Sequence, residues 1–168
     1  MFQPVTAPAE PKPDFYRLLD KQLQSLLGDE RNYIANSANF AALVYLMLPN
    51  LNWAGFYFLQ SNDLVLGPFQ GKPACIRIPV YPTPRGVCGY SAFQRKALIV
   101  PNVHEFPDHI ACDSASNSEV VIPLIDAERV IGVLDLDSPL LARFDHDDLA
   151  GLSILVNTFI KATDFSRL

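Results

Sequence analysis

The sequence predicts an α+β domain in which a central antiparallel sheet of about six strands is flanked by helices. Two segments with apolar residues at helical spacing come first, strand-like segments joined by polar turns follow, and another helical segment closes the chain. Strands and helices do not alternate as they would in a parallel α/β sheet. The 168 residues, 49% of them hydrophobic and 18% charged, suffice for one buried core.

The chain divides into a short arm and one domain. Residues 1–13 contain four prolines and no apolar periodicity, which predicts an extended N-terminal arm. We expect a single domain over residues 14–168. Apolar residues recur every three or four positions over 14–27 and again over 31–48, where Pro49 would end the second helix.

The remaining segments are assigned from their period and their turns. The strands are expected at 53–59, 64–69, 74–79, 97–100, 119–125 and 130–136, with a helix beginning near Arg85–Gly86. Residues 102–118 should form a long irregular loop, and such loops inside compact domains are often functional. Asp145 is the expected N-cap of a closing helix, with Asp148 in its first turn.

Composition argues against several classes of protein. The net charge is −5 and the Lys and Arg residues are scattered, so nucleic acid is not an expected partner. No run approaches the roughly 20 apolar residues of a membrane helix, and the N-terminus lacks a signal peptide. We therefore expect a cytoplasmic protein with no membrane partner. An odd set of three cysteines, Cys75, Cys88 and Cys112, argues against a structural disulfide framework.

Three acidic residues are expected to share one face of the last hairpin. With a loop of three or five residues, Glu119 lies opposite Asp135, on the same face as Asp137, and the aliphatic side chains point the other way: Val120, Ile122, Leu124, Val130, Leu134 and Leu136. An even loop would bury the aspartates among those aliphatics at high cost, so the odd register is favoured. Crowded carboxylates raise at least one pKa and retain a proton donor. The alternative is a solvated acidic face.

Two cysteines lie where their reactivity could matter. Cys112 is seven residues before Glu119, so the chain keeps it near the acidic hairpin. A thiolate there would need loop N–H groups or His109 to offset the acidic field. Cys88 would lie near a helix N-terminus, which favours a thiolate, although packing of a small residue is the alternative.

Neither a metal nor a cofactor is expected. The spacing of the histidines and cysteines matches no common zinc site, and no Cys-x-x-Cys pair is present. Trp53 and Tyr57 share parity on one strand, so they could form the wall of an aromatic pocket or simply fill the core.

Taken together, five segments resemble the free methionine-(R)-sulfoxide reductases, which are GAF-domain enzymes. The segments are ACIRIP (74–79), RGVCG (85–89), FPDHIACD (106–113), SEVVIPL (118–124) and IGVLDLDSP (131–139), and the similarity spans residues 14–163. Generic GAF sensors do not combine these motifs. The resemblance therefore implies a GAF-type fold and a thiol-dependent oxidoreductase that acts on free methionine sulfoxide.

The resemblance also implies roles for individual residues. Cys112 would attack the sulfoxide sulfur and become a sulfenic acid, Cys75 would resolve it as a disulfide that thioredoxin reduces, and Cys88 would be an alternative resolving thiol. Glu119, Asp135 and Asp137 would bind substrate and help protonate its oxygen, while Trp53 and Tyr57 would surround its methyl group. Members of the family are commonly homodimers.

One departure and two alternatives accompany this interpretation. The segment PVYPTP (79–84) is about three residues longer than expected for the family, and its prolines restrict the backbone beside Cys75. A GAF small-molecule sensor would use the same pocket without turnover, but it normally needs an output domain, which we do not expect here. A thiol redox switch would use the cysteines but would not need the carboxylates or aromatic residues.

Overall fold

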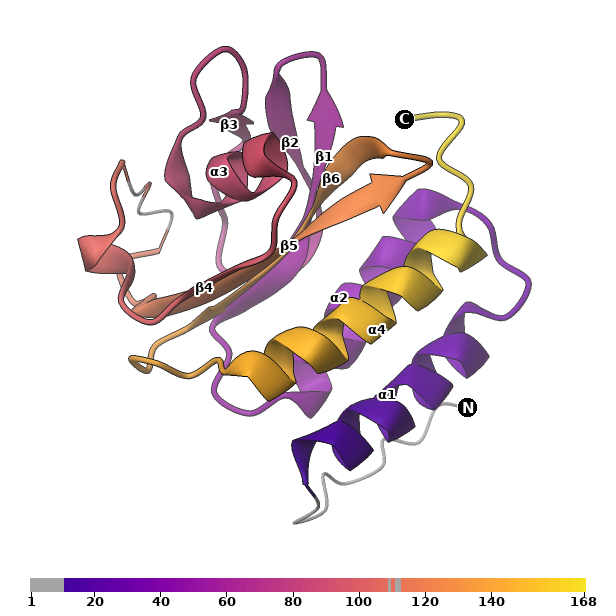
Figure 1. Cartoon of the computed structure of the whole chain (residues 1–168). Helices are drawn as coiled ribbons and strands as arrows, with labels where there is room; N and C mark the ends of the chain where they lie inside the picture. The colour runs from indigo at the N-terminus through magenta and orange to yellow at the C-terminus, as the bar shows by residue number, and fades with distance from the viewer. Residues whose placement is uncertain (1–10, 109, 111–112) are drawn as a thin grey trace.

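The computed structural model describes residues 11–108, 110 and 113–168, and it contains one six-stranded antiparallel sheet with helices on both faces (Figure 1). The strand order is β3-β2-β1-β6-β5-β4. This confirms the predicted α+β class. Residues 1–10 of the expected arm lie outside the described residues, as do His109 and Cys112.

The elements follow the predicted order. The helices are α1 (Lys12–Leu27), α2 (Tyr33–Met47), α3 (Gly86–Gln94) and α4 (His146–Ala162), with a short 3-10 helix at Val103–Glu105. The strands are β1 (Trp53–Gln60), β2 (Asp63–Gly71), β3 (Arg77–Pro79), β4 (Leu98–Val100), β5 (Ser118–Asp126) and β6 (Arg129–Ser138).

The sheet separates two hydrophobic cores of unequal size. Figure 1 shows α2 and α4 along one face of the sheet, α1 outside them beside α4, and α3 on the other face. The larger core lies under the three long helices and includes Phe40, Phe56 and Phe159. The smaller core lies under α3 and includes Trp53 and Tyr57. Because successive strand residues point to opposite faces, each strand of the hairpins contributes to both cores.

The start of α4 is fixed by a network around Asp148. Asp145 is the N-cap, as predicted, and forms a capping box with Asp148. The buried Asp148 carboxylate accepts a 2.8 Å hydrogen bond from Tyr16 of α1 and pairs with Arg143 (3.1 Å) and Lys12 (2.7 Å). The carboxylate thereby ties α1 to α4.

Two element boundaries differ from the expected ones. Helix α1 begins at Lys12 rather than at 14, because Pro13 is tolerated in a first turn, where its missing N–H has no intrahelical partner. Strand β3 covers only Arg77–Pro79 of the expected 74–79. The two residues before β3 are still held against the neighbouring strands. The Ile76 carbonyl accepts a hydrogen bond from Leu66 N of β2, and the Cys75 carbonyl accepts one from Tyr57 Oη of β1, both at 3.0 Å.

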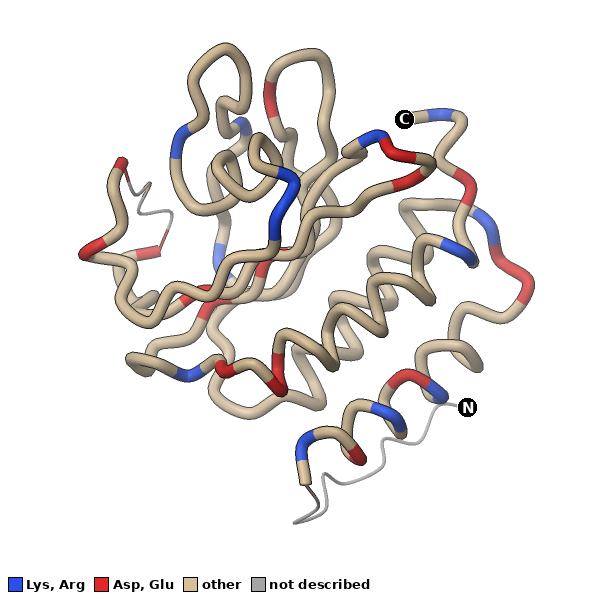
Figure 2. The backbone as a smooth tube through the Cα atoms, viewed as in Figure 1, with Lys and Arg blue, Asp and Glu red and all other residues tan. Residues whose placement is uncertain are grey.

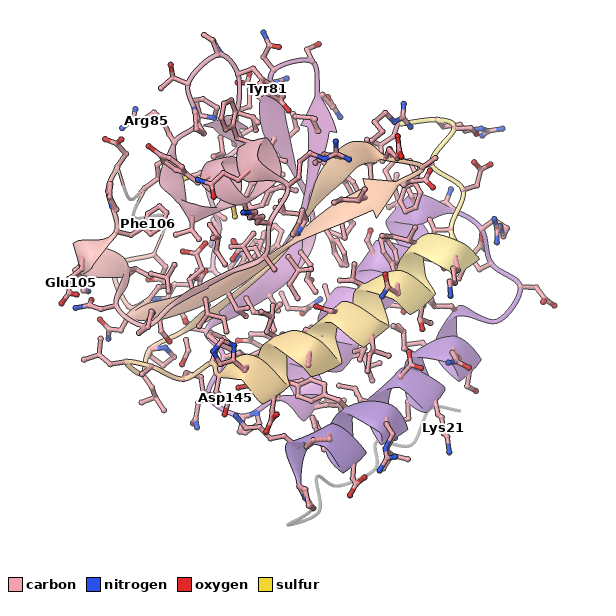
Figure 3. All side chains as sticks on the ribbon, viewed as in Figure 1. Lys21, Tyr81, Arg85, Glu105, Phe106 and Asp145 are labelled. Atoms are coloured by element: carbon pink, nitrogen blue, oxygen red, sulfur yellow. The ribbon has the colours of Figure 1, made fainter. Side chains whose placement is uncertain are left out.

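The proline-rich segment 79–84 is anchored at both ends. Its Val80 and Tyr81 N–H groups donate to the Asn62 carbonyl at 2.9 and 3.1 Å. The ring of Tyr81, labelled in Figure 3, packs against Phe93 of α3 with centroids 5.7 Å apart. At its far end, Arg85 N donates to the Pro79 carbonyl at 3.1 Å. The segment 79–84 therefore forms a closed loop packed against α3.

The β5–β6 hairpin has the predicted acidic face, but its turn differs from the predicted one. Its turn has two residues, Ala127 and Glu128, both with positive φ (44° and 68°), between the paired Asp126 and Arg129. This even turn contradicts the predicted odd loop. A bulge compensates, because Leu124 pairs with Gly132 and Ile125 with Val130, which leaves Ile131 as an extra residue in β6.

The bulge restores the parity on which the acidic face depends. Glu119 pairs with Asp137 rather than with the predicted Asp135, whose partner is Val121. The prediction that Glu119, Asp135 and Asp137 share a face is nevertheless confirmed. Val130, predicted on the other face, packs in the smaller core with Val121, because it precedes the bulge.

Candidate active site

Three carboxyl groups meet at the edge of the smaller core. Glu119 and Asp135 are each only 6% exposed, and Asp137 is partly exposed. Their neighbours on the same face include the fully buried Val121 and Val133. The alternative of a solvated acidic face is therefore wrong.

Burial and mutual repulsion favour the protonated forms of these groups. Burial, followed by the charges of Asp135 and Asp137, raises the pKa of Glu119 well above its ordinary value. The pKa of Asp137 is also raised, by burial and then by the charge of Asp135. Burial raises the pKa of Asp135 to about 6, against hydrogen bonds from Cys88 and Glu119 that lower it. The cluster therefore retains proton donors near neutral pH.

An aromatic wall stands next to the carboxyl groups. Trp53 and Tyr57 project from the same face of β1, where Trp53 pairs with Asp137 of β6. Their rings are stacked with centroids 5.8 Å apart, and Trp53 also stacks on Phe69 at 5.4 Å. Gly55 lies beneath the indole, since a Cβ there would come within 2.6 Å of Trp53 Cη2. The expected aromatic wall is present.

A pocket lies between these groups, helix α3 and the loop after the 3-10 helix. Its lining comes from β1 and β2–β3 (Trp53, Tyr57, Pro73, Ala74, Ile78), from α3 (Gly86, Val87, Cys88), from the loop (Ile110, Asp113, Ser116) and from the hairpin (Glu119, Asp135, Asp137). Figure 3 labels Arg85 and Phe106 on the two segments that meet at this end of the molecule. There, Gly86 N donates to the Asp108 carbonyl at 3.1 Å, which joins α3 to the loop.

Two buried polar atoms among the lining residues have no hydrogen-bond partner within the described chain. They are the indole nitrogen Nε1 of Trp53 and the carboxylate oxygen Oδ1 of Asp135. Leaving buried polar groups unpaired is costly, and such groups are typical of sites that a ligand completes. One donor and one acceptor are thus available to a polar ligand.

Cys88 is a buried, neutral thiol. Burial is the largest cause that raises its pKa, and the charges of Asp135 and Glu119 add to it. The packing of Cys88 as a small buried residue is therefore confirmed and the thiolate alternative is wrong, because desolvation and then the acidic neighbours outweigh the helix dipole. Its Sγ lies 3.8 Å from Glu119 Oε1.

Asp113 anchors the loop, a function that sequence reasoning missed. Its carboxylate accepts from Ala115 N (2.9 Å) and from Asn52 Nδ2 (3.2 Å), and Lys72 Nζ lies 3.3 Å away. Asn52 also donates to Ser116 Oγ at 2.9 Å. The backbone hydrogen bond, followed by those from Asn52 and Lys72, lowers the pKa of Asp113. The sequence offered one hint of this function, namely that Asp113 is next to the candidate nucleophile Cys112. Cys112 itself is not among the residues that the structure describes.

The described residues contain one group of possible metal ligands, and it belongs to this pocket. One ligand atom from each of Cys88, Glu119 and Asp135 lies within 4.8 Å of the others. His104 is elsewhere, with Nε2 2.9 Å from Asn117 Oδ1. A neutral thiol is a poor cation ligand, and the raised pKa of Glu119 favours its protonated form, so this group suits proton transfer better.

Two further features bear on binding to nucleic acids and to membranes: the distribution of basic residues and the apolar character of the helices. Figure 2 shows Lys and Arg dispersed over the helices, turns and loops of the described chain, with no gathered basic face. Among the same residues, no helix combines the length and the apolar character that crossing a bilayer requires.

Comparison with known proteins assigns the fold to a class. The GAF domain family model matches residues 21–162. A solved structure of free methionine-R-sulfoxide reductase from Neisseria meningitidis in complex with its substrate is 41% identical, with a TM-score of 0.88 and coverage of 96% of this chain and 95% of that one. A substrate complex of the Staphylococcus aureus enzyme, fRMsr, is 45% identical with a TM-score of 0.82, covering 88% and 94% of the two chains. The fold is thus that of a GAF domain.

A curated relative shows which family of GAF-domain proteins this chain belongs to. The free methionine-R-sulfoxide reductase of Escherichia coli strain K12 is 46% identical over 159 residues, which cover 93% of this chain and 94% of the relative. This protein belongs to the free methionine-R-sulfoxide reductase family of GAF-domain enzymes.

Proposed function

We propose that the protein reduces free methionine (R)-sulfoxide to methionine with Cys112 as the nucleophile. The observation that carries the proposal is the pocket itself. Two buried carboxyl groups, of Glu119 and Asp135, and the partly exposed one of Asp137 have raised pKa values and face a stacked aromatic wall. Ile110 and Asp113, on either side of Cys112 in sequence, line the same pocket.

The proposed reaction needs a proton donor and two thiols. The Cys112 thiolate attacks the sulfoxide sulfur while Glu119 protonates the sulfoxide oxygen. The attack forms a bond between the Cys112 sulfur and the substrate sulfur. The protonated oxygen then transfers to the Cys112 sulfur: a Cys112 S–O bond forms while the substrate S–O bond and the new sulfur–sulfur bond break. Methionine leaves as the reduced thioether, and Cys112, which has supplied the two electrons, becomes a sulfenic acid. The thiol of Cys75 condenses with this sulfenic acid, which forms a Cys75–Cys112 disulfide and releases water.

The substrate's polar groups match those of the pocket. Asp135 and Asp137 are suited to bind the α-ammonium group, and the unpaired Oδ1 of Asp135 is available as an acceptor. The unpaired Trp53 Nε1 is available to donate to a sulfoxide or carboxylate oxygen. Trp53 and Tyr57 would surround the methyl group with aromatic surface.

Regeneration of the enzyme is part of the proposal. A reduced thioredoxin would attack the disulfide, become oxidised itself and return both thiols, as expected of a cytoplasmic reductase. Cys75 is half-buried, and its carbonyl is held by Tyr57, so its backbone is fixed against the aromatic wall. The anchored loop 79–84 further limits motion on this side.

The exposed side of α2 supports a homodimer. The helix contains no charged residue, and it exposes Ile34 (53%), Tyr45 (38%) and Leu46 (60%). Exposed apolar patches of this kind often mark interfaces, and a self-complementary face suits a two-fold dimer. Sedimentation of the wild type and of Leu46→Asp would test it: the wild type should be a dimer and the variant a monomer.

The activity itself is tested with separate epimers of free methionine sulfoxide. Purified protein is mixed with thioredoxin, its reductase and NADPH, and methionine formation is measured for the (R) and the (S) form. We expect turnover of the (R) form only. N-acetylmethionine sulfoxide, which lacks the ammonium group, should be a poor substrate because Asp135 and Asp137 lose their ionic partner. Binding of the (R) form without turnover of either epimer would instead identify a sensor.

A further inference from the structure

The thiol of Cys88 lies against the carboxyl group of Glu119. Cys88 is in the first turn of α3, is a free thiol and is 3% exposed. Its Sγ is 3.8 Å from Glu119 Oε1, within hydrogen-bonding range for sulfur. A neutral thiol has one S–H donor, and of the two carboxyl groups beside it Glu119 is the one whose distance and angles to Sγ make a hydrogen bond, so we assign the donor to Glu119 Oε1.

The position of Cys88 is fixed by close backbone contacts of α3. A Cβ on Gly89 would lie 2.6 Å from the Pro79 carbonyl oxygen, so only glycine allows α3 to approach β3 this closely. Gly86, with φ +62°, lies against Ile110, where a Cβ would be 3.3 Å from Cγ1. The helix is therefore held between β3 and the loop that leads to Cys112, and Cys88 points onto β5.

Titratable groups face Glu119 from α3, β6 and β1, while the paired strand β4 contains none. They are Cys88 on α3, Asp135 and Asp137 on β6, and Tyr57 on β1, while Asp113 in the loop acts on Asp137. The thiol is the group here whose hydrogen bond stabilises the Glu119 carboxylate against the repulsion of the two aspartates. Its loss would therefore leave Glu119 harder to ionise and oriented only by its hydrogen bond to Asp135.

We infer that Cys88 is a positioning residue for the reaction: its S–H group donates to Oε1 of Glu119 and leaves Oε2 to carry the proton that reaches the sulfoxide oxygen. The inference rests on the proposed role of Glu119 as the proton donor. It gives Cys88 a function as a neutral hydrogen-bond donor, in place of a second resolving thiol.

The test compares Cys88→Ala, which removes the donor, with Cys88→Ser, which keeps a donor of similar size. The single-turnover rate of sulfoxide reduction by the pre-reduced full-length protein is measured across the pH range. For Cys88→Ala we expect a loss of about 3- to 10-fold and a shift of the alkaline limb to higher pH by up to about one unit. Cys88→Ser should retain the wild-type profile.

A control variant separates positioning from helix stability. Ser91→Ala removes a partly buried 2.8 Å hydrogen bond from the Ser91 hydroxyl to the Lys96 carbonyl just beyond the C-terminal end of α3. It should lower the melting temperature without moving the alkaline limb. Identical profiles in Cys88→Ala, Cys88→Ser and the wild type would overturn the inference. So would normal single turnovers in both variants with loss of thioredoxin-coupled cycling, because that result defines a resolving thiol.

A second readout is independent of activity. The infrared band of the protonated Glu119 carboxyl group, assigned by its disappearance in Glu119→Gln, is titrated in each Cys88 variant. Cys88→Ala should move its titration to higher pH and Cys88→Ser should not. If wild-type protein reduces neither epimer, the proposed function fails, and this titration alone still decides whether Cys88 hydrogen-bonds to Glu119; an unchanged titration overturns it.

Discussion

Glu119 on β5 and Asp137 on β6 are register partners, so their side chains leave the same face of the hairpin at directly opposite positions. Such partners have Cβ atoms about 4.5–5.5 Å apart. Burial and the shared negative field raise the pKa of both groups. Two residues along the same face, Asp135 completes a cluster that binds protons more tightly than free carboxylates do.

Glu119→Gln should slow the chemical step with the fold intact. Glutamine keeps the size and hydrogen-bonding capacity of the side chain but cannot deliver a proton, so the single-turnover rate should fall about 10²–10⁴-fold. The wild-type rate should also decline as pH rises through the raised pKa of Glu119, and the variant should lack this dependence.

The matched control is Glu105→Gln. Glu105 is exposed and accepts a 2.8 Å hydrogen bond from Asn102, which the amide oxygen of glutamine can replace. Its rate should equal that of the wild type. A folded Glu119→Gln protein with wild-type single turnovers at every pH would contradict the general-acid assignment.

Cys112→Ser should abolish turnover. A hydroxyl is a far weaker nucleophile toward sulfur than a thiolate, and it forms neither a sulfenic acid nor a disulfide. Methionine formation should fall to background, while calorimetry should still detect binding of the (R)-sulfoxide. Substantial residual activity would mean that the nucleophile is a different residue.

Cys75→Ser should separate the first turnover from the cycle. The sulfenic acid can still form on Cys112, so about one methionine per protein molecule should appear in a burst. Thioredoxin-dependent turnover should then stop, because no resolving thiol is present. A dimedone-type probe should label the trapped sulfenic acid by mass spectrometry. Full steady-state activity would show that Cys75 is dispensable for resolution.

Asp135→Asn should stabilise the fold at neutral pH while it impairs substrate binding. The pKa of Asp135 is raised to about 6, so the folded state binds its proton more tightly than the unfolded state does. Wild-type stability should therefore fall as pH rises from about 4 to about 6, and this loss persists above that window. Asparagine removes the buried charge, so its free energy of unfolding should exceed the wild type's by about 1–3 kcal/mol at pH 7.

Urea unfolding at pH 7 and at pH 4 measures this effect. Most of the difference between Asp135→Asn and the wild type should be gone at pH 4, where the aspartic acid is protonated in the folded state and about half protonated in the unfolded state. An advantage of equal size at both pH values would indicate better packing instead of relief from a buried charge.

Hydrophobic periodicity was sufficient for the architecture. It located all four helices and both hairpins, and the Asp145 N-cap followed from residue type alone. It overestimated β3, because Ala74–Ile76 follow the neighbouring strands through single hydrogen bonds without forming a ladder. Such pairing depends on tertiary contacts that no local pattern encodes.

The site was only partly accessible from sequence. The shared face of the three carboxyl groups followed from the cost of burying them among aliphatics, a rule that holds whichever turn is used. The pairing partner of Glu119 did not follow, because it depends on a bulge without a sequence signal. The neutrality of Cys88 and the anchoring of Asp113 by Asn52 both depend on residues brought together from distant segments.

The extra residue at Ile131 limits which changes of length the β5–β6 hairpin of this protein can tolerate. Loops such as 79–84 can lengthen without moving any strand residue to the other face of the sheet. Removing one residue from β6 would instead exchange the two faces of the strand beyond it, sending Asp135 and Asp137 into the larger core and Leu134 and Leu136 into the pocket. Inserting or deleting one residue in this strand would thus remove the proton donors from the pocket and disrupt the larger core at the same time. Sequence change in β6 must therefore proceed by substitution rather than by insertion or deletion.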